Sequence, residues 1–267
     1  MAATDVSFAP ARTGWKLGRR GMITSVQVAT FLAVWAGWET LSRSGLLYEG
    51  VVPSSIDVFA AIGRHLVDPA FWDHGGRTAY EVVAGFAIGA GIGVSLGLLL
   101  GLRRFMAAVT EPFINYLAAT PKIVFLPILM VMFGVGPGSK VAMAAISTFF
   151  PVALSVYRGT LLVNPVLVRV ARSFNASQWR IVWSVYLPSL VPPLLTGLRL
   201  GLGVAIVGTL LAEIKLANKG LGYVVIQHYN FFRTADMYAV LIIIFVIAVA
   251  INAAMDLAAV RLSHKAR

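Results

Sequence analysis

The sequence predicts an all-α membrane protein with about six transmembrane helices. Of its 267 residues, 58% are hydrophobic and only 12% are charged, which is about half the charged fraction of a typical soluble domain. The apolar residues fall in separate runs of roughly 20 residues, the length that crosses a bilayer. We therefore expect one integral membrane domain at residues 22–260, between an N-terminal segment (1–21) and a C-terminal tail (261–267).

Six apolar runs have the length of a span, and proline or glycine within them is compatible with helix in a bilayer. The first run, from Met22 to Leu41, exceeds the apolar core of a signal peptide, and no Ala-x-Ala cleavage site follows it. We expect it to persist as a transmembrane helix. The predicted spans are residues 22–42, 78–101, 112–134, 139–162, 187–212 and 237–259.

The distribution of basic residues predicts that both termini are cytoplasmic. With that orientation, thirteen lysines and arginines lie in cytoplasmic segments and seven in outer segments, while Lys122 and Arg199 lie inside spans. The net charge of +11 is then a topology signal, and a nucleic-acid-binding surface is not needed to explain it.

Several kinds of chemistry are not indicated. The chain contains no cysteine, which excludes disulfides and thiolate metal sites, and its four histidines have no metal-ligand spacing. The segment "GVGPGSK" does not match the G-x-x-x-x-G-K-[ST] phosphate loop. Because no catalytic combination of side chains is evident, we expect a non-enzymatic subunit.

After the first span, the segment "VVPSSIDVFAAIGRHL" predicts a helix lying on the outer surface, with Ser54 or Ser55 as its N-cap. An ordinary amphipathic connector is the alternative. The apolar residues that would share one face are Ile56, Phe59, Ile62 (or Gly63) and Leu66.

Small residues recur at every fourth position of the second and fifth spans. In lipid this spacing lets helix backbones approach closely, so we expect helix packing, within the chain or across a dimer. Direct substrate contact is the alternative. The residues are Gly85, Gly89, Gly93, Gly97 and Gly101 in the second span, and Gly197, Gly201 and Ala205 in the fifth.

Lys122 lies inside the third predicted span, where an ionisable side chain is costly and marks a candidate functional site. Pro121 and Pro127 are expected to bend or break this helix, as at many transport sites. Lys122 either faces a central cavity and attracts an anion, or extends to the cytoplasmic interface or pairs with Glu111.

The predicted cytoplasmic connection, residues 163–187, contains a short amphipathic helix. Asn164 is a favourable N-cap, Pro165 suits the first helical position, and Asn175 can end the helix in the left-handed conformation. It is either an interfacial helix anchored by Trp179 and Trp183, or a docking helix for a cytoplasmic partner. Its apolar side is Val166, Leu167, Val170, Ala171 and Phe174, and its polar side is Arg169, Arg172 and Ser173.

This connection resembles the loop E-A-A-x3-G-x9-I-x-L-P of ABC importer permeases. Arg169-Val170-Ala171 stands at E-A-A, Asn175 at the glycine, Val185 at the isoleucine and Leu187-Pro188 at L-P, without a gap. The segments "LPSLVPPLLTGLRLGLG", "KGLGYVV" and "LPILMVMFGVGPGSKVAM" are similar to the taurine/sulfonate, nitrate and bicarbonate branch. The resemblance covers most of residues 50 to 260.

The resemblance implies a type I importer permease fold in a bacterial inner membrane, surrounded by lipid. It implies a second permease, identical or homologous, two ATPase subunits that hold the ATP and magnesium, and a periplasmic or lipid-anchored binding protein. This chain would carry no cofactor and bind no nucleic acid, and would pass a small anion such as a sulfonate, nitrate, bicarbonate or organic carboxylate. The implied coupling residues are Val166, Arg169, Val170, Ala171, Arg172, Phe174, Asn175, Leu187 and Pro188.

Arg169 departs from the family, which has a glutamate there, so either the ATPase groove supplies an acid or this position faces elsewhere. Arg199 ties the fifth span to another helix or to headgroups, or contacts substrate. Glu213 closes that span, either at a gate facing the binding protein or as an ordinary interface residue. A stand-alone secondary carrier or membrane scaffold is the alternative function.

Overall fold

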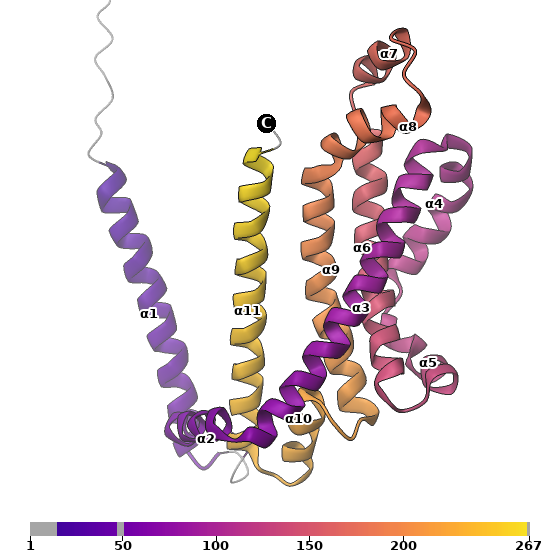
Figure 1. The fold of residues 1–267 in the computed structure, drawn as a ribbon. Coiled ribbons are helices and arrows are strands. Elements are labelled where there is room, and N and C mark those ends of the chain that lie inside the picture. Colours follow the sequence, from indigo (N-terminus) through magenta and orange to yellow (C-terminus); the bar gives the residue numbers. More distant parts are fainter. Residues whose placement is uncertain (1–14, 47–50, 266–267) are drawn as a thin grey trace, which may run out of the picture.

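The computed structural model describes residues 15–46 and 51–265, in which every regular element is a helix. The N-terminal end of α1 (Trp15–Arg43), the short helix α7 (Pro165–Ser173) and the C-terminal end of α11 (Thr234–Lys265) lie at one end of the molecule, which we call the α7 end (Figure 1). At the opposite end, the α10 end, lie α2 (Ser55–Val67) and α10 (Leu221–Asn230).

Among the described residues, five helices are long and apolar enough to cross a membrane, and a bent helix pair adds a sixth span if it crosses as one unit. The first, fourth and sixth predicted spans are confirmed within a few residues by α1, α6 (Pro137–Leu161) and α11. The all-α class predicted from the apolar runs is therefore correct.

Two helices extend beyond their predicted bounds. α3 (Pro69–Leu102) begins well before residue 78, because the Asp68 side chain accepts a hydrogen bond from the N–H of Ala70 (2.9 Å) and proline fills the first helical position. α9 (Leu187–Leu216) is preceded without a break by α8 (Gln178–Ile181) and a π-helical turn. Capping and turn geometry decide where these two helical segments begin, and a hydrophobicity profile does not show these features.

The third predicted span, residues 112–134, is broken at Pro121, as the prolines in it predict. The chain forms α4 (Arg104–Ala119), a 3₁₀ turn (Lys122–Phe125) and α5 (Leu126–Phe133), and the pair is bent by 94°. Thr120 has an extended ψ of 135°, because the residue before a proline, here Pro121, is driven out of the helical region. The helix therefore ends where the proline begins.

α6 is the centre of the bundle, with α3 and α9 packed along it. An added Cβ at Gly97 would lie 2.5 Å from the Ala153 carbonyl oxygen on α6, and one at Gly197 would lie 2.7 Å from the Cβ of Ser155. The glycine rows of α3 and α9 thus contact the backbone and small side chains of α6 within the chain. The glycines of this contact are Gly85, Gly89, Gly93, Gly97, Gly197 and Gly201.

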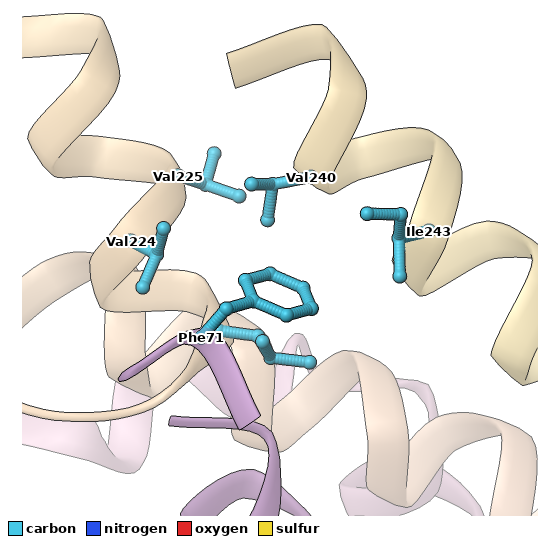
Figure 2. Close-up of a cluster of buried hydrophobic side chains, with 6 residues drawn as sticks. Phe71, Val224, Val225, Val240 and Ile243 are labelled. Atoms are coloured by element: carbon cyan, nitrogen blue, oxygen red, sulfur yellow. The ribbon is translucent and has the colours of Figure 1, made fainter. Parts of the chain in front are cut away.

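A second group of buried side chains joins α3, α10 and α11 at the α10 end. The ring of Phe71 packs among Val224 and Val225 of α10 and Val240 and Ile243 of α11 (Figure 2). This cluster fixes the short helix α10 against two long helices.

The helix predicted after the first span is confirmed as α2, and Ser54 is its N-cap. Its predicted apolar face is not the buried one, however. Ile56 and Phe59 are exposed, whereas Val58 and Ala61 are buried against the rest of the chain. Of the other predicted members of that face, Leu66 is exposed and Ile62 packs against the buried cluster at the α10 end.

α1 stands apart from the other long helices, since none of the residues in its apolar stretch is buried. Its contacts lie near its C-terminal end, where the indole N–H of Trp38 donates to the Pro53 carbonyl (3.0 Å) and that of Trp35 to the Ser55 hydroxyl (2.9 Å). The remaining face of α1 is left to the surrounding membrane or to another chain.

Candidate functional site

α7 is held as a short helix by caps at both ends. The Asn164 side chain accepts a hydrogen bond from the backbone N–H two residues on (2.9 Å). Asn175 has a φ of +54°, and its N–H donates to the Arg172 carbonyl (2.9 Å), while the N–H of Ala176 donates to the Ala171 carbonyl (3.1 Å). These two bonds form a Schellman motif, which explains the need for asparagine at this position.

No residue of α7 is buried, so its apolar side faces outward without a partner in the described structure. Its other side carries Arg169 and Arg172, which are also exposed. Neither arginine forms an ion pair within the described residues. The exposed fractions on the apolar side are 48% for Val166, 49% for Leu167, 48% for Val170 and 82% for Phe174.

A continuous helical segment from Gln178 leads from the α7 region into α9. Its π-helical turn, Val182–Tyr186, lies just before Leu187 and Pro188. Proline lacks an N–H and its ring clashes with the carbonyl four residues back, so the turn widens at this point. Because α9 packs closely on α6, a displacement at the α8 end would be carried directly into the core of the bundle.

Lys122 lies at the break between α4 and α5, and its ammonium group donates to the carbonyl oxygens of Leu117 (3.0 Å), Ala118 (2.7 Å) and Thr120 (2.6 Å). These carbonyls belong to the last turn of α4 and to its C-cap, Thr120, and that of Leu117 also accepts from the Thr120 N–H (3.3 Å). The alternative of a pair with Glu111 is not observed, because that carboxylate accepts a hydrogen bond from the Tyr157 hydroxyl instead (3.0 Å).

Arg199 of α9 forms an ion pair with Asp256 of α11 (2.6 Å). Both side chains are about half exposed and line a cavity of about 600 Å³ together with Thr196 and Asn252. Arg199 therefore ties its helix to another helix, which is one of the roles expected for it.

Glu213 is fully buried where α9 approaches the α10 end. One carboxylate oxygen accepts a hydrogen bond from the Thr78 hydroxyl of α3 (2.7 Å), and the other accepts from the N–H of Gly222 in α10 (2.7 Å). The Thr78 oxygen accepts in turn from the N–H of Leu221 (2.8 Å). The carboxylate lies against Gly220, which has a φ of +116°. Glu213 thus fastens the α9–α10 connection to α3 and does not face the outer surface.

Two further buried ionisable residues near Glu213 were missed from the sequence. Glu81 is 2% exposed and accepts a hydrogen bond from the Arg77 side chain (3.1 Å). Lys140 of α6 is also 2% exposed. The carboxyl groups of Glu81 and Glu213 are close enough to interact electrostatically with its ammonium group. The rule that singled out Lys122, an ionisable group inside an apolar span, would have found both. Among the described residues, no group of three histidines or acids could hold a metal ion.

Replacing Glu213 by leucine should lower the free energy of unfolding by about 3 kcal/mol. It leaves the buried Gly222 N–H without an acceptor and the Thr78 hydroxyl with only a long contact to the His74 carbonyl (3.4 Å). Thermal unfolding in detergent measures the loss. The matched control is Asp73→Leu, which removes an exposed pair with Lys219 and should change the melting temperature little. An equal loss in both variants would contradict the role assigned to Glu213.

Comparisons with known proteins agree on a family. Residues 89–267 match the family described as binding-protein-dependent transport system inner membrane component. The taurine transport system permease protein TauC of Escherichia coli K12 is 28% identical over 236 residues, which are 88% of this chain and 86% of that protein. A probable ABC transporter permease protein of Haemophilus influenzae is 30% identical over 220 residues, 82% of this chain and 89% of that protein.

The fold is also found in a solved transporter. A chain of the MetNI methionine ABC transporter, in an inward-facing conformation, superimposes with a TM-score of 0.58 and 20% identity, covering 80% of this chain and 99% of that chain. A putative aliphatic sulfonates transport permease protein SsuC of Bacillus subtilis is 27% identical over 88% of this chain and 82% of its own length.

Proposed function

The chain belongs to the family of binding-protein-dependent transport system inner membrane components, and we propose that α7 is the contact through which separate ATPase subunits drive it as an importer permease. In this arrangement the chain forms the membrane path and hydrolyses no ATP. ATP and magnesium are bound by the two ATPase subunits, each of which takes α7 of one permease into a groove.

The observation that carries the proposal is the exposed apolar side of α7. A nine-residue helix is marginal in water on its own, yet α7 is capped at both ends and lies beyond the ends of α6 and α9 (Figure 1). Burying a valine, leucine or phenylalanine side chain contributes about 1.5–3 kcal/mol. An ATPase groove that covers the apolar side of α7 therefore binds it without the free-energy cost of ordering the helix first.

The route of coupling follows from the chain connections. ATP-driven closure of the ATPase subunits displaces α7, and the continuous segment from α8 through the π-helical turn transmits the displacement to α9. Since α9 and α3 both pack on α6, the bundle moves as a unit relative to a second permease, identical or homologous. That movement exposes the path to one side of the membrane at a time, as alternating access requires.

The orientation of the chain in the membrane and its other partners follow from docking of the ATPase subunits on α7. The α7 end is cytoplasmic, with both termini on that side, as the lysine and arginine distribution favours. The α10 end faces a periplasmic or lipid-anchored binding protein. The solute is a small anion, for which the relatives named for taurine and aliphatic sulfonates supply the argument.

Arg169 lies on the polar side of α7, where the family has a glutamate. An exposed arginine can pair bidentately with a carboxylate, so the groove that receives this helix is proposed to present an acid at that point. A groove that keeps a basic group there would be repelled by Arg169.

Co-purification tests the proposal. A tagged permease should retain its ATPase subunits after detergent extraction, and Val170→Asp should lose them because the substitution places a carboxylate in an apolar contact. Ser173→Asp adds the same charge to the polar side of α7 and should retain them. ATPase subunits that remain on the Val170 variant, or none on the wild-type chain, would reject α7 as the docking element and favour a stand-alone carrier.

A further inference from the structure

We infer that the cavity beside the break in the α4–α5 span is an anion subsite of the transport path, with Lys122 supplying the positive charge. The cavity has a volume of about 480 Å³ and is lined by residues from α4, the 3₁₀ turn, α6 and α9. The inference rests on the proposed transport function, whose substrate class it narrows to small monovalent anions.

The walls combine one cation with largely apolar surface. Lys122 and Pro121 come from the break, Ser147 and Phe150 from α6, and Gly208 from α9. Among the described residues, Lys122 is the sole ionisable side chain that lines this cavity, and its ammonium lies 4.8 Å from the centre of the Phe150 ring. The Ser147 hydroxyl offers a neutral hydrogen-bond donor on the same lining.

The charge of Lys122 has no counter-charge in the part of the chain that the structure describes. Arg77 is paired with Glu81, and Arg199 is paired with Asp256. The Lys122 ammonium contacts only neutral groups, namely three backbone carbonyls and an aromatic ring. A cation in an apolar span is costly unless it is paired, so an anion that enters the cavity gains the pairing that the protein does not provide.

The three carbonyls also position the ammonium. They lie in the last turn of α4 and at its C-cap, Thr120, where Pro121, which has no N–H, ends the helix. All three ammonium protons are used in this arrangement. An entering sulfonate or carboxylate replaces one carbonyl as acceptor, and the exchange is favourable because a hydrogen bond between two charged groups is about twice as strong as one to a neutral group.

The lining also selects among anions. One ammonium balances one negative charge, so a divalent sulfate would carry an uncompensated charge into apolar surroundings. The valine and leucine side chains of α9 that complete the wall, Val204, Val207 and Leu211, accommodate a short alkyl group. A small alkanesulfonate or carboxylate meets both conditions. The same helix receives the displacement from α7, so the cavity lies where the transport movement reaches the bundle.

Ethanesulfonate is a suitable probe, with ethanol and ethylammonium as neutral and cationic controls. For the detergent-purified importer, we expect ethanesulfonate to raise the melting temperature in a concentration-dependent way, and ethanol and ethylammonium to leave it unchanged. Lys122→Gln keeps hydrogen-bond donors for the α4 carbonyls but removes the charge, and should weaken ethanesulfonate binding about 10- to 100-fold, the range of a hydrogen bond to a charged group. Lys122→Arg keeps the charge and should bind close to wild-type strength.

Lys219→Gln, at an exposed lysine of the α10 end, is the matched control and should bind ethanesulfonate as the wild-type importer does. The inference is overturned if ethanesulfonate stabilises the wild-type importer no more than ethanol, or stabilises the wild-type and Lys122→Gln importers equally. A lower melting temperature of Lys122→Gln with unchanged ethanesulfonate affinity also overturns it, since Lys122 would then only cap α4. These measurements do not involve α7, so their failure is distinct from loss of ATPase co-purification.

Discussion

An importer whose permease carries Val170→Asp and Phe174→Asp is expected to take up its solute at least about 100-fold more slowly than the wild-type importer. Each substitution removes an apolar contact of about 1.5–3 kcal/mol and places a carboxylate in the interface, and every 1.4 kcal/mol lowers affinity tenfold. Both positions are exposed in the described structure, at 48% and 82%, so the folded permease should persist. Uptake by cells and substrate-stimulated ATP hydrolysis by the purified importer measure the effect.

Ser173→Asp controls for added charge on α7 and should leave uptake within about twofold of wild type, since surface substitutions generally have small effects. If the double variant transports at the wild-type rate while its amount in the membrane is unchanged, the apolar side of α7 does not carry the coupling. If the control fails as strongly as the double variant, the loss reflects charge on α7 in general and contradicts the face-specific contact.

The Gly89→Leu permease should accumulate in the membrane at a small fraction of the wild-type amount. A side chain at this position would overlap the Ala145 carbonyl and come within 2.8 Å of the Cβ of Thr148, both on α6. Backbone atoms cannot move aside as a flexible side chain can, so α3 and α6 must separate along their length. We expect a loss of at least about 3 kcal/mol in stability, at the upper end of overpacking effects.

Gly91→Leu is the matched control, because nothing lies within 4 Å of an added Cβ on that side of α3. Leucine is also the better helix former, by roughly 0.5–1 kcal/mol, so this variant should accumulate at least as well as wild type. Fluorescence-detected size-exclusion chromatography compares the two. Equal amounts of folded protein from both variants would contradict the close α3–α6 packing.

The features that the sequence predicted correctly are local ones. A run of apolar residues reports a span directly, which is why α1, α6 and α11 were found within a few residues. The caps of α7 were also readable, because Asn164 and Asn175 act on backbone groups one to three residues away. The fourfold spacing of Gly85 and its successors indicated packing, although the identity of α6 as the partner required the structure.

The features that escaped prediction depend on distant parts of the chain. Pro121 predicted a break in the third span, but the size of the bend, 94°, depends on how α4 and α5 pack against α6. Glu213 accepts its hydrogen bond from Thr78, 135 residues away in the sequence, so no local pattern could show that its carboxylate is buried. Glu81, by contrast, lies inside a predicted span and could have been found by the rule that singled out Lys122.

The central claim, that α7 contacts the ATPase subunits, is tested most directly by placing a cross-linker on it. The chain contains no cysteine, so Phe174→Cys creates a single thiol that can carry a photoactivatable maleimide. The account predicts an adduct of permease and ATPase subunit whose yield changes when ATP is added, and none from Ile92→Cys, an exposed position on α3. Absence of the adduct at position 174, or equal adducts from both positions, would contradict it.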